Sequence, residues 1–343
     1  MKKIKLVFSV ILLFSSILYS QSGLRIGEIG NFKLANGDTI YNCKIGYRLF
    51  GKMNENKSNI ILFPTWFGGT TKGLMNLIGS GKLIDSSKYY IITVDALGDG
   101  ISSSPSNSER QPGSEFPVFN ITDMVNSQYK LLTEILHIDH VYGVLGGSMG
   151  GMQTFQWMVS YPDFMDKAIP YVGSPKLTSY DLLLLNTELN IVKLGHKYNI
   201  SDNELIKSLA GLQALQAHTP AYIVANTNPE DYNEFAQKTY DNFKEFFNSY
   251  NWASQIKAML QMDISKNYHG SMERASQNIK ARVLIIVSKT DHIVNPKPAL
   301  DFAQMINAET FIFENNCGHL APGCEMEKFV EVVNNFLSDK PGE

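Results

Sequence analysis

The feature that most constrains the fold of this chain is a series of short apolar runs separated by helical patterns. Each run is too brief for a helix and suits a strand buried on both faces of a sheet. The stretches between several of them repeat apolar residues at three- and four-residue spacing, as helices do. The runs span residues 59–63, 89–94, 141–145, 168–172, 283–287 and 310–313, and the helical patterns span 121–136, 149–160, 298–306 and 325–337. This alternation predicts an α/β fold with a mostly parallel central sheet flanked by helices.

An antiparallel edge is expected before these runs. The turn-forming sequence Ala35-Asn36-Gly37-Asp38 separates apolar stretches at 32–34 and 40–50. Asn-Gly between apolar strands is a strong signal for a tight hairpin. We therefore expect the sheet to begin with an antiparallel pair.

The alternation lapses between residues 174 and 280. We therefore expect residues 21–173 and 281–343 to form the core, and 174–280 to form a helical lid or cap inserted into it. Aromatic rings recur at helical spacing in 242–252, which predicts a helix with a ring-rich face. These rings are Phe243, Phe246, Phe247 and Tyr250. They either pack the insertion onto the core or line an acyl-binding cleft beneath a lid.

Composition and charge exclude several classes of protein. The chain is 44% apolar and 18% charged, so it can bury a sizeable core. Its 30 basic and 33 acidic residues give a net charge of −3 without a block of like charge, which argues against nucleic acid as a partner. None of the three cysteines has zinc-site spacing, so neither a metal nor a cofactor is implied.

The first twenty residues have the pattern of a secretory signal peptide. Three lysines precede an apolar run over residues 6–18, and Ser20 offers a cleavage point before Gln21. The run is shorter than the ~20 residues that a membrane-spanning helix needs. We expect removal of residues 1–20, a net charge of −6 after the loss of three lysines from −3, and a secreted or periplasmic protein. An uncleaved anchor is the alternative.

The segment from Val141 to Gly151 carries the pattern G-x-S-x-G as Gly146, Ser148 and Gly150, between a predicted strand and a predicted helix. A serine on so sharp a turn needs glycines on both sides, because a Cβ there would collide with the strand or the helix. The segment is not a dinucleotide-binding fingerprint, because G-x-G-x-x-G needs a glycine at position 148. It is not a P-loop, because no lysine follows the glycines. Ser148 is the predicted nucleophile, and an idle serine in a glycine-rich turn is the alternative.

A nucleophilic serine of this kind needs a histidine base, which follows the serine and the acid in the chain. His319 comes directly after the last predicted strand, in a loop expected above the sheet edge. His292 abuts the predicted acid and His269 lies inside the insertion, so both fit less well. We predict that His319 is the base.

The acid is expected at the carboxyl end of the preceding strand. Asp291 follows the run 283–287 there. It would accept a hydrogen bond from the imidazole Nδ1–H and stabilise the imidazolium. Asp263 and Asp301 are alternatives within helical patterns.

The oxyanion hole is expected to combine two backbone N–H groups. Met149, directly after the nucleophile, supplies the first. The second comes from the loop Pro64–Gly69 after an early strand, where Trp66 is the preferred donor and Phe67 the competing register.

The sequence around Ser148, on the predicted turn between a strand and a helix, resembles the homoserine O-acetyltransferase branch of the α/β-hydrolase superfamily. The resemblance covers roughly residues 30 to 338, and its most specific carriers are Gly146–Gln153, Trp157, Tyr161-Pro162 and Ile121–Val125. It implies the α/β-hydrolase fold with Ser148, Asp291 and His319 as nucleophile, acid and base. In that family the serine is acetylated by acetyl-CoA and passes the acetyl group to homoserine.

Two departures weaken the transfer of that reaction. The family binds the carboxylate of homoserine through an arginine, but residues 182–194 contain none, and an ungapped alignment places Asn190 there. Lys193 or Lys197 would have to replace it. The loop Pro64–Gly68 also differs from the family's His-Ala-Leu-Thr-Gly type of sequence.

The three cysteines have different expected roles. Cys317 and Cys324 bracket His319, so a disulfide closing that loop is one reading and two buried thiols are the other. Cys43 lies in an early strand and is expected to pack there.

Three classes of function remain. The favoured one is an exported serine hydrolase acting on a small-molecule ester through an acyl-enzyme. The second is an O-acyltransferase of homoserine acetyltransferase type, which moves an acyl group from acyl-CoA to an alcohol. The third is a binding protein that kept the fold without the activity. The oligomeric state is open, with a homodimer through the insertion as one arrangement.

Overall fold

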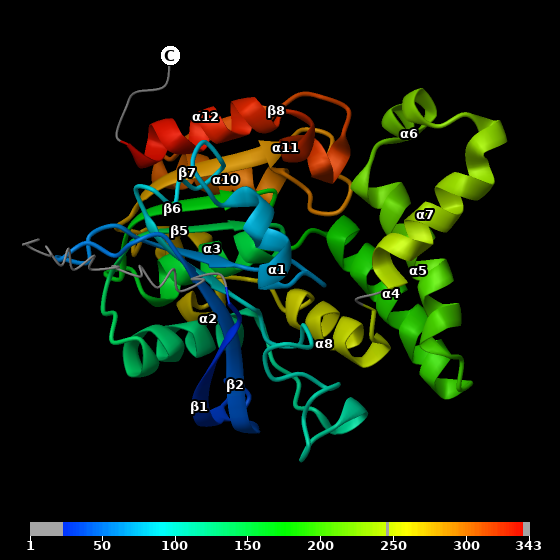
Figure 1. Ribbon diagram of the computed structural model, residues 1–343, viewed down its shortest axis with the longest axis horizontal. Helices are drawn as coiled ribbons and strands as arrows, with labels where there is room; N and C mark the ends of the chain where they lie inside the picture. Colours follow the sequence, from blue (N-terminus) through cyan, green and yellow to red (C-terminus); the bar gives the residue numbers. More distant parts are fainter. Residues whose placement is uncertain (1–22, 245–246, 339–343) are drawn as a thin grey trace, which may run out of the picture.

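An eight-stranded sheet forms the centre of the protein in the computed structural model, which describes residues 23–244 and 247–338 (Figure 1). The strand order is β1-β2-β4-β3-β5-β6-β7-β8, with β1 and β2 antiparallel to their neighbours and the remaining pairs parallel. The strands are β1 Arg25–Lys33, β2 Thr39–Phe50, β3 Ile60–Pro64, β4 Tyr90–Val94, β5 Val141–Gly147, β6 Met165–Tyr171, β7 Arg282–Ser288 and β8 Glu309–Phe313. Both the antiparallel edge and the six predicted parallel strands are confirmed. The predicted signal peptide, residues 1–20, lies outside the described residues.

Helices cover both faces of the sheet and fill the chain between β6 and β7. They are α1 Thr71–Leu74, α2 Ile121–Lys130, α3 Met149–Ser160, α4 Ser179–Lys197, α5 Asp202–Ala217, α6 Pro220–Asn226, α7 Tyr232–Lys244, α8 Ser249–Met259, α9 Met272–Ser276, α10 Lys297–Ile306, α11 Ala321–Cys324 and α12 Met326–Leu337. None of the described helices is long and apolar enough to cross a bilayer.

Alternate residues along the central strands belong to two separate core clusters. In β3, Ile60 and Leu62 pack into one cluster with α2, α3 and α10, whereas Ile61 and Phe63 pack into the other with α1 and α12. Because side chains alternate across a strand, the clusters lie on opposite faces of the sheet. This explains why the strands read as continuous apolar runs rather than as alternating ones.

Two of the predicted helices are shorter than their apolar spacing suggests. The pattern over 121–136 forms α2 and then one π-helical turn, Leu131–Ile135. The prediction of one ring-lined helix over 242–252 is wrong, because Phe247 and Asn248 lie outside any helix and α8 begins at Ser249. Phe246 lies outside the described residues. Asn248 caps α8 by accepting a hydrogen bond from the backbone N–H of Asn251, and this capping starts a new helix.

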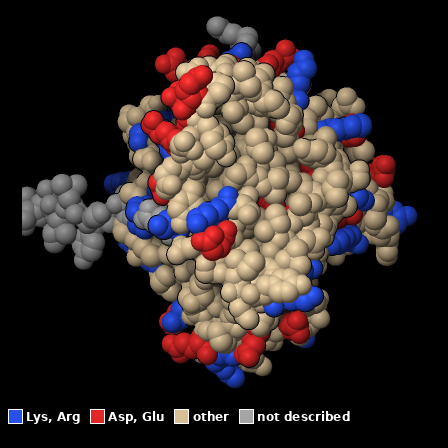
Figure 2. All heavy atoms as spheres, turned by 90° about the vertical axis from the view of Figure 1, so that its right-hand side faces the viewer, with Lys and Arg blue, Asp and Glu red and all other residues tan. Residues whose placement is uncertain are grey.

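Helices α4 to α9 occupy the whole segment between β6 and β7, and α4 to α7 stand to the right of the sheet in Figure 1. Leu185 and Leu189 of α4 and Trp252 of α8 belong to the same core cluster as α2 and α3. Figure 2 views the molecule from the right-hand side of Figure 1, and much of the face that it shows has no charged side chains. A homodimer through this segment stays a prediction.

Candidate active site

Ser148 sits on a sharp turn between β5 and α3. Its backbone has φ 55° and ψ −123°, which is strained for any residue other than glycine. A Cβ on Gly146 would lie 2.2 Å from the carbonyl oxygen of Gly150, and a Cβ on Gly150 would lie 2.8 Å from that of Pro64. The collisions predicted from the sequence are therefore present on both sides of the serine.

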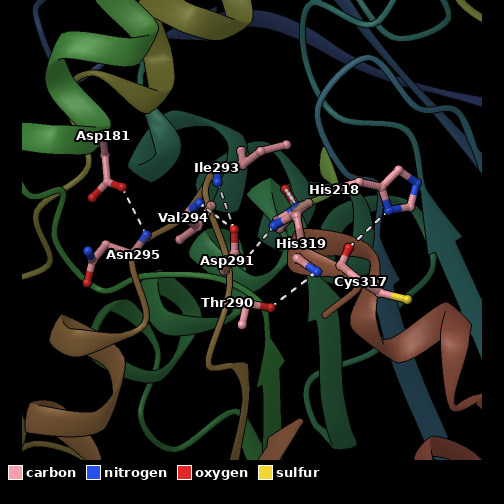
Figure 3. A network of polar contacts seen from close by, with 11 residues as sticks. Asp181, His218, Thr290, Asp291, Ile293, Val294, Asn295, Cys317 and His319 are labelled. Carbon is pink, nitrogen blue, oxygen red and sulfur yellow. Dashed lines mark hydrogen bonds and ion pairs between the residues drawn. The ribbon is translucent and has the colours of Figure 1, made fainter. Parts of the chain in front are cut away.

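A chain of hydrogen bonds joins Ser148 to His319 and His319 to Asp291. Figure 3 shows the pair of His319 and Asp291. The Oγ of Ser148 donates to Nε2 of His319 at 3.0 Å. The Nδ1–H of His319 donates to Oδ2 of Asp291 at 2.7 Å, since an ionised carboxylate only accepts. His319 and Asp291 are both 7% exposed. The structure thus brings together three residues that the sequence places after β5, β7 and β8.

The carboxylate of Asp291 is held in place by its own loop. Its Oδ1 accepts hydrogen bonds from the backbone N–H groups of Ile293 at 2.8 Å and Val294 at 2.9 Å. The next N–H, that of Asn295, donates to Asp181 at 2.9 Å (Figure 3). Because Asp181 belongs to the capping box of α4, the loop over residues 291–295 is fixed to the first helix of the α4–α9 segment.

The loop that carries His319 is fixed by a disulfide and by the α5–α6 junction. Cys317 and Cys324 are bonded, with Cα atoms 6.6 Å apart. The ring of His218 donates through Nδ1 to the carbonyl of Cys317 at 3.1 Å, and Thr219 donates to the carbonyl of Asn316 at 2.5 Å. His319 is therefore positioned by residues about a hundred positions away in the chain.

The alternative acids are engaged elsewhere. Asp263 forms an ion pair with Lys176 at 3.0 Å, and Asp301 forms one with Lys297 at 2.8 Å. The third cysteine, Cys43, is buried in β2 as expected, and burial raises the pKa of its thiol to about 12.

The candidate oxyanion donors lie on two segments that contact each other. The backbone N–H groups of Met149, Trp66 and Phe67 donate to none of the residues that the structure describes. Gln153 of α3 donates to the carbonyl oxygens of both Thr65, at 3.0 Å, and Met149, at 3.2 Å. This amide ties the loop after β3 to the start of α3, and both Trp66 and Phe67 remain candidates for the second donor.

Helix α8 holds the same loop from the other side. The side-chain carbonyl of Gln255 accepts from the N–H of Gly68 at 2.9 Å, and its amide donates to the carbonyl of Leu97 at 3.1 Å. The rings of Phe67 and Trp252 pack edge to face with centroids 4.4 Å apart. The α4–α9 segment therefore contacts all three loops around the site.

A cavity of about 480 Å³ opens at Ser148 and His319. Phe243 is one of the predicted ring residues and does line it. No Lys or Arg is present among the described residues of its wall. The wall is mainly apolar and consists of Trp66, Phe67, Leu77, Gly147, Ser148, Met152, Tyr171, Val172, Leu177, Leu185, Glu188, Gln213, Ala217, Phe243, Met259, Ile293, Val294, His319, Leu320, Pro322, Gly323, Met326 and Phe329.

Glu188 of α4 is a cavity residue that the sequence interpretation missed. Asn190, the position taken from the ungapped alignment, is exposed on α4, whereas Glu188 is completely buried. Glu188 shares a buried stripe with Leu185, Leu189 and Val192 at helical spacing. The sequence signal that could have revealed Glu188 is a glutamate among apolar residues on the buried face of a helix.

The fold and the site together define an enzyme of the serine hydrolase and acyltransferase class. A family model described as "alpha/beta hydrolase fold" matches residues 59–322, and the chain belongs to this family.

Known relatives include both ester hydrolases and acetyltransferases. The chain is 30% identical to an ethyl acetate hydrolase of Pseudomonas veronii, over 85% of this chain and 88% of that protein. It is also 30% identical to a homoserine O-acetyltransferase of Methanosalsum zhilinae, over 90% of this chain and 71% of that protein. The solved structure of the acetyl esterase MekB superposes with a TM-score of 0.85 and 26% identity, covering 93% of this chain and 97% of that one. The predicted resemblance to the homoserine acetyltransferase branch is confirmed.

Proposed function

We propose that this protein is an exported carboxylic ester hydrolase that works through an acyl-enzyme on Ser148. The observation that carries the proposal is the chain of hydrogen bonds from Asp291 through His319 to Ser148, opening into a mainly apolar cavity. The names of two relatives, an ethyl acetate hydrolase and an acetyl esterase, make short acetate esters the first substrates to test.

In the acylation step, His319 Nε2 takes the proton of Ser148 as Oγ attacks the ester carbonyl carbon. The carbonyl oxygen becomes an oxyanion, which the N–H of Met149 and that of Trp66, or of Phe67, stabilise. Asp291 accepts from Nδ1–H and stabilises the imidazolium. The tetrahedral intermediate then expels the alcohol, which takes the Nε2 proton.

In the deacylation step, water replaces the alcohol. His319 removes a proton from the water as its oxygen attacks the acyl carbon. Collapse of the second tetrahedral intermediate breaks the bond to Oγ, returns the proton to Ser148 and releases the free acid. The proton transfers between Ser148 and His319 follow a hydrogen bond that is already formed in the structure, and Asp291 already accepts from His319.

Transfer of the acyl group to an alcohol is the second candidate, favoured by the 30% identity to a homoserine O-acetyltransferase. Homoserine itself fits poorly as the acceptor. Its carboxylate would be desolvated in a wall that offers no Lys or Arg among the described residues and holds the acidic Glu188 instead. Lys193 and Lys197 are exposed on α4 and do not belong to that wall. Burying an unpaired carboxylate costs several kcal/mol.

Export is the remaining part of the proposal. It is supported by the lysine-led apolar pattern of residues 1–20 and by the Cys317–Cys324 disulfide, because disulfides persist in oxidising compartments. Mass spectrometry of the secreted material should find an N-terminus near Gln21. A mature chain that retains Met1 would contradict export.

The reaction is tested with protein starting at Gln21. Ethyl acetate or p-nitrophenyl acetate should yield free acetate, and a fluorophosphonate should label Ser148. Acetyl-CoA with homoserine should yield little O-acetylhomoserine. Homoserine acetylation with a kcat/KM near ~10⁴ M⁻¹s⁻¹, within the ordinary enzyme range, would overturn hydrolysis in favour of transfer.

A further inference from the structure

Glu188 is one of the residues that line the cavity at Ser148, but its carboxyl group has no part in the mechanism above. Its Oε1 accepts a hydrogen bond from Nε2 of Gln213 in α5 at 2.6 Å. Its Oε2 accepts one from the indole N–H of Trp252 in α8 at 3.1 Å. Three helices therefore hold this carboxyl group in one place within the same cavity as Ser148.

The hydrogen-bonding capacity of this group is only partly used. A carboxylate accepts up to about four hydrogen bonds, and the two donors that reach Glu188 are both neutral. The side-chain oxygen of Gln213, which also lines the cavity, accepts no hydrogen bond from the residues that the structure describes. Acceptor capacity is thus left over on two neighbouring cavity residues.

The carboxylate of Glu188 also has no cationic partner in the described cavity wall. No Lys or Arg is present among the described residues of the cavity wall, and Glu188 is completely buried. Burial raises the pKa of Glu188 to about 7, against the lowering effect of its hydrogen bonds from Trp252 and Gln213. A cationic group brought into the cavity would stabilise the ionised form.

We propose that Glu188 and Gln213 form a subsite for a cationic ammonium group that donates a hydrogen bond, so that the preferred substrates are esters carrying a protonated amine. This proposal rests on the proposed ester hydrolysis and names the substrate class of that reaction. The apolar wall takes the carbon chain, and the two side-chain oxygens take the N–H. A charge-assisted hydrogen bond of this kind gives strong discrimination against an uncharged isostere.

A structural role for Glu188 makes a different prediction. Glu188 accepts a hydrogen bond from Trp252, and Trp252 packs on Phe67 in the loop after β3. Glu188 therefore also supports the loop that carries the candidate oxyanion donors. If that were its whole role, replacing it would slow the hydrolysis of every ester by the same factor. A substrate-binding role changes the ratio between two esters instead.

The test compares 3-(dimethylamino)propyl acetate, protonated at pH 8, with the uncharged 4-methylpentyl acetate of the same shape. The wild-type protein should prefer the amine by about 10- to 100-fold in kcat/KM, the range for a hydrogen bond between charged partners. Glu188→Gln should reduce the ratio to near 1, because the amine ester loses its charged partner and the alkyl ester does not. Glu204→Gln, which removes a carboxylate from the exposed part of α5, is the matched control and should keep the wild-type ratio.

Three outcomes overturn the subsite: a wild-type ratio near 1, an equal loss for both esters in Glu188→Gln, or the same change in Glu204→Gln. If Glu188→Gln does not fold, Gln213→Ala provides the second variant and should also lower the ratio. If wild type hydrolyses neither ester, ester hydrolysis fails, and calorimetry still tests the subsite. In the Ser148→Ala background the amine ester should then bind more tightly with Glu188 than with Glu188→Gln, and equal affinities would refute the subsite.

Discussion

Trp252 packs edge to face against Phe67, with ring centroids 4.4 Å apart and an interplanar angle of 65°. The contact joins α8 to the loop after β3, which carries the candidate oxyanion donors. Gln255, on the next turn of α8, accepts from Gly68 in the same loop at 2.9 Å. The segment between β6 and β7 therefore supports the loop that is proposed to stabilise the transition state, in addition to lining the cavity.

Gln255→Ala tests this support. Without the hydrogen bond to Gly68 the loop loses its fixed position, and oxyanion stabilisation, which acts only in the transition state, weakens. We expect kcat to fall about tenfold with KM within about threefold, less than the ~10²-fold or more seen when a donor itself is removed. Gln261→Ala is the control, because its amide donates only to the carbonyl of Lys257. A change in KM alone would refute the positioning role.

Ser148→Ala should abolish the acyl-enzyme. No other described group is hydrogen-bonded to His319 Nε2, so ester hydrolysis should fall by ~10³ or more. The melting temperature should stay near that of wild type, because the change removes one hydroxyl. Ser160→Ala, at the end of α3, is the matched control and should keep its activity. Full activity of Ser148→Ala in a preparation free of other esterases would remove the elbow from the mechanism.

Asp291→Asn should keep the geometry but favour the wrong imidazole tautomer. The new amide presents an N–H where Oδ2 now accepts from Nδ1 at 2.7 Å, and we expect a loss of ~10⁴ in kcat. Asp263→Asn, in the ion pair with Lys176, should leave kcat within a few fold. If Asp263→Asn were the damaging change, the acid would be misassigned.

The parts of the site that the sequence predicts are those coded by local patterns. Ser148 is flanked by glycines that a strand-to-helix elbow requires, and Asp291 and His319 lie in the loops that follow the mainly apolar strands β7 and β8. Carboxyl ends of parallel strands share one edge of the sheet, so the order of the strands brings these residues together.

The parts that the sequence does not predict depend on contacts between distant segments. Gln255 and His218 look like ordinary helix residues, and only the packing of α8 and of the α5–α6 junction gives them partners at Gly68 and Cys317. One local signal was also missed. Asn248 caps the start of α8, so the aromatic residues over 242–252 do not form one helix.

Removing the Cys317–Cys324 disulfide should destabilise the loop that carries His319. The bond closes a short loop, with a sequence separation of 7, and the chain-entropy model gives about 2.5 kcal/mol for a loop of this size. Cys324→Ser should therefore lower the melting temperature by about 5 °C and reduce kcat as His319 loses its fixed position. Dithiothreitol should act on wild type in the same way and have no further effect on the Cys317→Ser/Cys324→Ser variant. Equal melting temperatures of oxidised and reduced wild type would contradict the prediction.

The buried carboxyl of Glu188 should give the protein a pH-dependent stability. Its pKa is about 7 in the folded state against 4.5 as the ordinary value, so between these pH values the folded state binds more protons than the unfolded state. The free energy of unfolding therefore falls as pH rises through this window, by about 3 kcal/mol in total at 1.36 kcal/mol per pKa unit.

Glu188→Gln removes this ionisation, whereas all other ionisable groups remain in both proteins. Urea unfolding of wild type and variant at pH 5, 6, 7 and 8 isolates the contribution of Glu188. Relative to wild type, the variant should gain about 2.5 kcal/mol between pH 5 and pH 8, because only wild type must bury a charge at the higher pH. Parallel profiles would show that Glu188 ionises in the folded protein as easily as in the unfolded chain.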